Sequence, residues 1–345
     1  MTVREVRFHP VREPVSRRAY TLVKIQTAGG VTGWGEAAGH EPQKWKTVET
    51  ALAGVSAASY EVLSRKLAAQ GALEAGVNIA LLDILGQVAK APVYQVLGGP
   101  TRFKVRAYAS VDEKGVAAAR SAGYRAVGLK VPEPPFPNSG KQYVLRVKAA
   151  MEAARSAAGA DMDFVIEGDG RLAAGDAQQL AEAFERFHPL WFDEPVRHGN
   201  LAALRKVSDE NVTPVGVGRA VVSASEFQDI LREEAADLLR PSLAHFGVSR
   251  IRRIAALAET YYIAVAPHHD GGPIGTAALL HAAASMPNFF IQSIPQAGDA
   301  RDREMRMALG GAVEKVTDGF AALPTGAGLG FRVDESAIAR YREAA

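Results

Sequence analysis

Cysteine is absent from the 345-residue chain, which excludes disulfide bonds, a thiolate nucleophile and any cysteine-bound metal. An excess of charge is absent too. The 40 basic and 38 acidic residues leave a net charge of +2, so neither nucleic acid nor an anionic membrane is an expected partner. We expect no apolar run to be long enough to span a membrane, and the first residues, MTVREVRFHP, lack the apolar segment of a secretory signal. These absences predict a cytoplasmic protein with no membrane partner.

Seven short apolar runs each end in a polar or charged residue, and successive ends are 23 to 37 residues apart. Short apolar strands that alternate with amphipathic helices indicate parallel strands buried on both faces. With VRAYAS at 105–110 there are eight strands, which predicts a closed barrel whose strand ends form the site. No G-x-G-x-x-G motif follows the first strand, which disfavours a dinucleotide-binding fold. The seven run ends are Lys130, Glu167, Asp193, Arg219, Ser242, His268 and Ser293.

The first hundred residues follow a different pattern. Residues 3–9 and 20–27 alternate as strands do, and a glycine-rich hairpin brings in a further strand that ends near Glu36. The pattern is helical from 46 to 98, until Gly98-Gly99-Pro100 stops it. Strands followed by helices are typical of an α+β domain.

The remaining elements complete a two-domain organisation. Helices are predicted over about 112–122 and 141–158 between barrel strands, and the tail from 324 predicts a short strand and a helix. We therefore expect an α+β domain over 1–100 and a barrel over 101–310. Residues 310–345 are expected to pack back on the first domain.

Several segments, in order along nearly the whole chain, resemble the enolase superfamily of the mandelate racemase and muconate lactonizing enzyme type, galactonate dehydratases included. TAGGVTGWGEA and VNIALLDILGQVAKAPVYQVLGG resemble its capping domain. GYRAVGLKV, IEGDGRL, WFDEPV, RPSLAHFG, APHHDGGPIG and NFFIQS resemble its successive barrel strands, and PTGAGLGFRVDE resembles its closing segment. The resemblance implies an α/β fold, a (β/α)7β TIM-like barrel with an α+β capping domain.

The resemblance also implies a chemistry, in which a lysine or histidine removes the proton α to a carboxylate and Mg²⁺ stabilises the product anion. It implies Lys130 as the base on one face and His268 as the catalytic residue on the other. Lys130 matches the second lysine of the family's Lys-x-Lys motif, whose first position is Gly128 here. The implied partners are a small carboxylate ligand and further copies of the chain in a homo-oligomer.

The metal ligands implied by the resemblance are three acids at successive strand ends. Glu167 and Asp193 occupy the first two positions, but Arg219 occupies the third. At about 4 Å a guanidinium repels a divalent ion by roughly 8 kcal/mol at an effective dielectric constant near 20. Two arrangements remain open. Either Glu167, Asp193 and Asp169 hold Mg²⁺, or these acids form salt bridges with Arg219.

Other positions also depart from the family pattern. Ser242 stands where an aspartate partners the histidine, and Ser293 stands where an acid often closes the site. We expect these serines, Tyr108 and Arg219 to contact the substrate, since a guanidinium can hold a carboxylate by two parallel hydrogen bonds.

Two principal functions follow from these residues. The first is a lyase or isomerase, such as a dehydratase or racemase, that acts on a hydroxy acid or sugar acid. The alternative is a metal-free member of altered or absent activity that binds an acidic ligand through Arg219. A third hypothesis is metal-free chemistry of another class in the same pocket.

Overall fold

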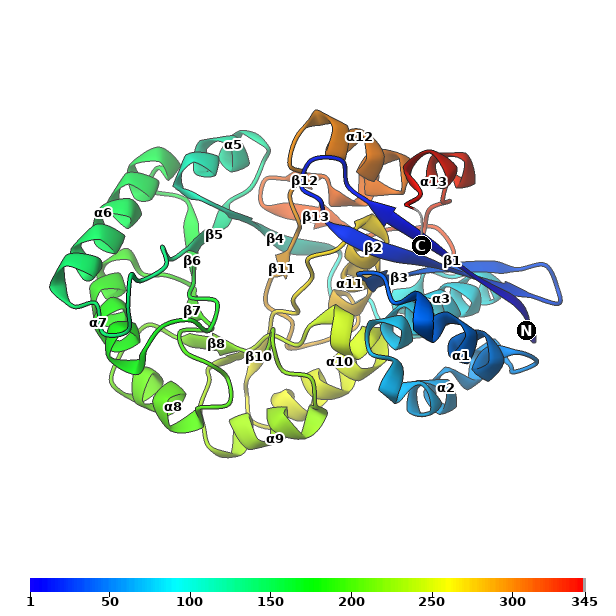
Figure 1. Cartoon of the computed structure of the whole chain (residues 1–345), viewed down its shortest axis with the longest axis horizontal. Helices are drawn as coiled ribbons and strands as arrows, with labels where there is room; N and C mark the ends of the chain where they lie inside the picture. The colour runs from blue at the N-terminus through cyan, green and yellow to red at the C-terminus, as the bar shows by residue number, and fades with distance from the viewer. Residues whose placement is uncertain (344–345) are drawn as a thin grey trace.

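Eight parallel strands form a closed barrel in the computed structural model, which describes residues 1–343 (Figure 1). Strand β11 pairs with β4, and a parallel bridge from Val265 to Phe289 completes the ring beside β10. The strands are β4 Lys104–Val111, β5 Ala126–Lys130, β6 Asp163–Glu167, β7 Trp191–Asp193, β8 Val215–Val217, β9 Leu238–Leu239, β10 Ala264–Val265 and β11 Gln292–Ser293.

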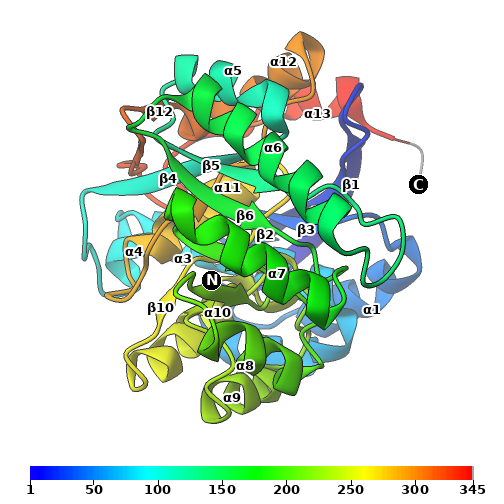
Figure 2. The same ribbon diagram turned by 90° about the vertical axis from the view of Figure 1, so that its left-hand side faces the viewer.

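Helices cover the outside of the barrel, as Figure 2 shows for α6 and α7. Helix α6 has the predicted bounds, Lys141–Ala158, and buries an apolar stripe that includes Val147, Met151 and Ala154. The helix expected over 112–122 is a 3₁₀ turn at Glu113–Gly115 followed by a shorter α5. The helices are α5 Val116–Ser121, α6, α7 Ala174–Phe184, α8 Leu201–Asp209, α9 Ala224–Arg232, α10 Leu243–Glu259 and α11 Pro273–Ala283.

Three of the predicted strand ends lie beyond the strands themselves. Arg219, Ser242 and His268 follow β8, β9 and β10 by two or three residues. Gly218 adopts a φ of +135°, which turns the chain after β8, and Pro241 has no N–H to continue the ladder after β9. Ser242 and His268 still pair as an isolated parallel bridge, so the predicted residues stay at the barrel mouth.

The N-terminal unit is a three-stranded antiparallel sheet in the order β1-β2-β3, with helices on one side (Figure 1). The region predicted as helical from 46 to 98 contains four helices separated by short loops. The elements are β1 Val3–Arg12, β2 Ala19–Thr27, β3 Thr32–Ala38, α1 Pro42–Leu52, α2 Tyr60–Lys66, α3 Ala72–Ala89 and α4 Val93–Val96.

Helix α3 corrects one expectation from the sequence. By length and composition it is a candidate membrane span, although no such run was expected. It packs against β3 on one side and against α10 of the barrel on the other, and most of it is buried. A helix that is apolar all round is also what a buried core position requires.

Glycines in β3 let α3 approach the sheet. A Cβ at Gly35 would collide with the carbonyl oxygen of Gly76, which belongs to the helix backbone and cannot rotate away. We therefore expect Gly35→Ala to lower the free energy of unfolding by about 1–3 kcal/mol or more through overpacking. Urea unfolding measures the loss. Gly29→Ala is the matched control, because a Cβ at Gly29 meets no atom within 4 Å. An equal effect of the two substitutions would contradict the close approach.

The C-terminal part returns to both units. The hairpin of β12 Val316–Thr317 and β13 Phe320–Ala322 pairs antiparallel with β4. Helix α13 Glu335–Tyr341 lies against β1, and α12 Ala300–Ala308 lies beside it (Figure 1). The strand expected after residue 324 is wrong. That segment is irregular, and Leu329 N donates its hydrogen bond to Asp83 of α3 at 2.9 Å instead of to a strand.

Candidate functional site

The register of neighbouring strands sets the site residues at one level. Lys130 pairs with Glu167, and Glu167 pairs with Asp193, so three predicted residues end their strands side by side. Gly128 precedes Lys130 by two residues on β5. Its lack of a side chain leaves room for Glu167, because a Cβ at position 128 would collide with Glu167 Oε1. Glu167 Oε2 accepts a hydrogen bond from Ser110 Oγ at 2.7 Å. Burial, and then the negative charge of Asp193, raise the pKa of Glu167.

Asp193 is fully buried, and its carboxylate lies between one tryptophan N–H and two guanidinium groups. Oδ1 accepts a hydrogen bond from Trp191 Nε1 at 3.0 Å. Oδ2 forms ion pairs with Arg240 Nη1 at 2.5 Å and with Arg219 Nε at 3.3 Å. Both oxygens are therefore engaged by groups of the protein itself.

Arg240, which follows β9, is a site residue that sequence reasoning missed. Its Nη2 donates to Tyr108 Oη at 2.7 Å, and its Nε donates to the carbonyl oxygen of Ala266 at 3.2 Å. The guanidinium also lies 5.4 Å from the ring of Trp191. The available signal was an arginine inside the apolar run LLRPS, where a buried charge requires a partner.

Arg219 forms a second ion pair, with Asp169 Oδ1. Burial alone would lower the pKa of Arg219, but the carboxylates of Asp193 and Asp169 outweigh it and raise the pKa. Asp169 has a φ of +56°, a strained conformation for a residue with a side chain, and this turn follows β6 directly. The ion pairs are those of the second arrangement that the sequence left open.

A divalent cation does not fit this set of contacts. Mg²⁺ needs carboxylate oxygens that can face it. Asp193 Oδ1 instead accepts from Trp191, Asp193 Oδ2 lies between two guanidinium groups, and Asp169 forms ion pairs with Arg219 and Arg171. Within residues 1–343, no group of three or more His, Asp or Glu side chains could hold a metal ion. The metal role implied for Glu167, Asp193 and Asp169 therefore has no support in the geometry.

Glu194, adjacent to Asp193, is another residue that sequence reasoning did not single out. It is buried, and its Oε1 accepts backbone hydrogen bonds from Gly218 and Arg219, both at 2.7 Å. Burial, followed by the charge of Asp193, raises its pKa. Glu194 thus fixes the turn that presents Arg219.

A cavity of about 720 Å³ lies at the barrel mouth, within the range typical of small-molecule sites. Four predicted residues share its wall, and additional cations and acids complete it. Neither Lys130 nor Arg197 forms an ion pair with any residue from 1 to 343. The predicted residues in the wall are Lys130, Asp169, Arg219 and His268.

His268 is half-buried, and its ring forms no ion pair with a carboxylate of residues 1–343. Burial, then the charges of Arg240 and Arg219, lower its pKa well below the ordinary value, so the ring is neutral at pH 7. Nδ1 has no hydrogen-bond partner among the described side chains and backbone. The two following residues do not supply one, since His269 Nε2 contacts the carbonyl of Gly272 and Asp270 pairs with Arg18.

Three predicted substrate contacts lie away from the cavity wall. Tyr108 is buried in the barrel interior, where its hydroxyl is a partner of Arg240. Ser242 and Ser293 are buried as well, and Ser293 Oγ lies 3.5 Å from the carbonyl oxygen of His269. Arg219 alone among the predicted substrate contacts lines the cavity.

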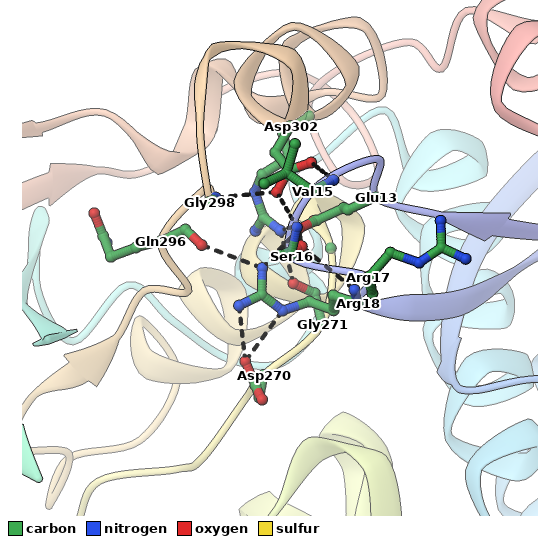
Figure 3. Close-up of polar contacts among 12 residues, drawn as sticks. Glu13, Val15, Ser16, Arg17, Arg18, Asp270, Gly271, Gln296, Gly298 and Asp302 are labelled. Atoms are coloured by element: carbon green, nitrogen blue, oxygen red, sulfur yellow. Dashed lines mark hydrogen bonds and ion pairs between the residues drawn. The ribbon is translucent and has the colours of Figure 1, made fainter.

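The loop between β1 and β2 contacts Asp270, which lines the cavity (Figure 3). Arg18 pairs with Asp270 at 3.1 Å and with the buried Glu13 at 2.9 Å, and it donates to the carbonyl of Gln296 at 3.2 Å. The N-terminal unit and the segments after β10 and β11 are thereby joined at the mouth.

Glu36 of β3 makes a second connection to the same segment. Its Oε1 accepts from Gly272 N at 2.5 Å and its Oε2 accepts from Gly275 N at 3.2 Å, at the beginning of α11. His269 lies 3.9 Å from this carboxylate, and Arg306, Glu314 and Tyr20 also face it. Burial raises the pKa of Glu36 to about 7.

A pH-dependent stability difference follows for Glu36→Gln. An acid whose pKa is raised on folding contributes stability below its unfolded value, and this stability is lost as the pH rises to the folded pKa of about 7. Glutamine does not titrate. We therefore expect the free energy of unfolding of the variant, relative to that of the wild type, to rise by up to about 3 kcal/mol between pH 4.5 and pH 7. Urea unfolding at pH 5 and pH 8 measures the change. The exposed Glu259→Gln is the control, and a difference that does not vary with pH would refute the expectation.

Comparison with known proteins gives matches along nearly the whole chain. Residues 2–98 match the model of the mandelate racemase / muconate lactonizing enzyme N-terminal domain, and residues 111–337 match the enolase C-terminal domain-like model. The structure of a mandelate racemase/muconate lactonizing enzyme-like protein from Roseovarius sp. TM1035 is similar with a TM-score of 0.88 and 26% identity, over 100% of this chain and 96% of that one. The predicted barrel with its capping domain is confirmed.

Similar proteins include sugar-acid dehydratases. The D-galactonate dehydratase of Xanthomonas axonopodis pv. citri (strain 306) is 30% identical over 355 residues, 94% of this chain and 91% of the relative. The D-gluconate dehydratase of Thermoproteus tenax is 28% identical over 351 residues, 93% of this chain and 69% of the relative.

Proposed function

We propose that this chain, which belongs to the mandelate racemase and muconate lactonizing enzyme family of the enolase superfamily, removes the proton α to the carboxylate of a hydroxy acid or sugar acid. The observation that carries the proposal is the shared wall of one cavity, where Lys130, Arg219 and His268 come together. Two similar proteins are dehydratases of D-galactonate and D-gluconate, which supports this substrate class.

Lys130 is the base in this proposal. Its side chain is exposed at the end of β5 and forms no ion pair with residues 1–343, so its amine is available to a ligand in the cavity. A lysine accepts a proton only as the neutral amine. Arg219 lies in the same wall of the cavity.

Arg219 holds the substrate carboxylate and stabilises the charge that develops on it. Asp169 and Asp193 contact its Nη2 and Nε, and Nη1 makes no contact with the described residues that would prevent it from donating. A guanidinium held in place by two acids is a preorganised donor, which is the arrangement that stabilises a developing anion. No step requires a divalent cation. His268, neutral at pH 7, faces the ligand from another part of the wall.

The test is exchange of the α-proton. A panel of hydroxy acids and six-carbon sugar acids is incubated with the protein in D₂O and followed by NMR. Exchange or turnover of at least one acid, in buffer treated with a chelator, is the expected result. Binding of an acid without exchange would instead favour a carboxylate-binding protein without turnover. The ion pairs of Arg219 with Asp169 and Asp193 also suit this second function, because they provide a rigid anchor without a catalytic partner.

A further inference from the structure

Two arginines contact Asp193, and they differ in access to solvent. Arg219 lies in the cavity wall and retains 19% of its side-chain exposure. Arg240 has none, because it lies inside the barrel below the mouth. Its Nη2 and Nε donate to Tyr108 and to the carbonyl of Ala266, and its Nη1 lies 2.5 Å from Asp193 Oδ2 as an ion pair. Arg240 is therefore a fixed part of the barrel interior.

The formal charges of this cluster have a specific balance. Glu167, Asp169, Asp193 and Glu194 contribute four negative charges, and Arg171, Arg219 and Arg240 contribute three positive ones, which leaves a sum of −1. Three carboxylates around one divalent cation would give the same sum. A guanidinium keeps its charge at all accessible pH values, so this balance does not depend on metal supply.

We propose that Arg240 and Arg219 together are a built-in replacement for a divalent cation, and that Arg240 is the residue that decides metal exclusion. The proposal rests on the proposed function for the location of the site, but its test measures metal binding and not turnover. Absence of α-proton exchange would contradict the proposed function but not this proposal. Unexpected metal binding would contradict this proposal but not the exchange result.

The buried position of Arg240 explains why this residue, more than Arg219, decides metal exclusion. Replacing Arg219 by glutamate would provide acids at the ends of β6, β7 and after β8. Asp193 Oδ2 would still have Arg240 Nη1 at 2.5 Å, held there by Tyr108 and Ala266. Since this guanidinium is fully buried and hydrogen-bonded to Tyr108 and Ala266, moving it aside for an incoming cation costs more than moving a side chain in the cavity wall.

Mn²⁺ binding tests the proposal, with electron paramagnetic resonance of free Mn²⁺ and equilibrium dialysis as the measurements. We expect no stoichiometric binding by the wild type or by Arg219→Glu. The double variant Arg219→Glu/Arg240→Gln is expected to bind about one Mn²⁺ per chain, at least about 100-fold more tightly than Arg219→Glu. Addition of Glu167→Gln should remove this binding, which places the ion at the cluster.

Three results would overturn the proposal. They are stoichiometric Mn²⁺ binding by the wild type that Asp193→Asn abolishes, equal binding by Arg219→Glu and the double variant, and absence of binding by a folded double variant. Circular dichroism and a thermal transition establish that each variant is folded. If glutamine at position 240 prevents folding, Arg219→Glu/Arg240→Met fills the space of the arginine stem and gives the same comparison.

Discussion

Lys130→Met is expected to reduce α-proton exchange by about 10²–10⁴-fold, the usual contribution of a positioned general base. Methionine keeps the apolar stem of the side chain and removes only the amine. The ion pairs that hold Arg219 in place do not involve Lys130, so binding of the acid through Arg219 should change little. The measurement is the exchange rate in D₂O at saturating acid, together with the dissociation constant of the same acid.

Lys206→Met is the matched control, because this lysine is exposed on α8 and does not line the cavity. It should exchange the α-proton at the wild-type rate. Exchange by Lys130→Met at the wild-type rate would exclude Lys130 as the base. Loss of exchange in His268→Gln but not in Lys130→Met would transfer the role to the neutral imidazole.

Arg240→Gln is expected to lower the free energy of unfolding by about 3–5 kcal/mol, because it leaves the fully buried Asp193 without its closest cation. The lost hydrogen bond to Tyr108 adds to the cost. Urea unfolding, followed by near-UV circular dichroism, measures the loss in the barrel.

A double variant separates charge from packing in this prediction. Arg240→Gln/Asp193→Asn contains no uncompensated charge at this pair, so we expect it to regain a large part of the loss. The exposed pair of Arg232 and Asp229, 3.8 Å apart, provides the surface control, and Arg232→Gln should cost less than about 1 kcal/mol. A loss of the same small size for Arg240→Gln would mean that water reaches Asp193.

The barrel could be predicted because the sequence pattern that produces it, an apolar strand followed by a helix, is periodic. Each strand is buried on both faces, so it appears as an apolar run, and each connection needs a helix of similar length. The helix predicted over about 141–158 is α6, Lys141–Ala158, and a glycine stands at each of its ends. The hairpin of β12 and β13 was missed, because strands of two and three residues leave no readable alternation.

The location of the site could be predicted from the sequence better than the contacts of its residues. Lys130, Arg219 and His268 were expected at one mouth because parallel strands end on one face, and they line one cavity. Tyr108 was expected at the same mouth, yet its ring lies in the interior. A strand-end position fixes the level of a residue in the barrel, but the direction and length of neighbouring side chains decide what it touches.

The sequence by itself therefore determined the fold, the face that carries the site and the presence of a cation at the third metal position. Only the tertiary structure decided how the charges are paired. Arg240 and Asp193 are 47 residues apart in the chain and have no shared sequence motif, but the two strands β7 and β9 direct both side chains into one barrel interior. A buried charge takes its partner from whatever lies within a few ångströms, and that distance is set by barrel closure and not by order along the chain.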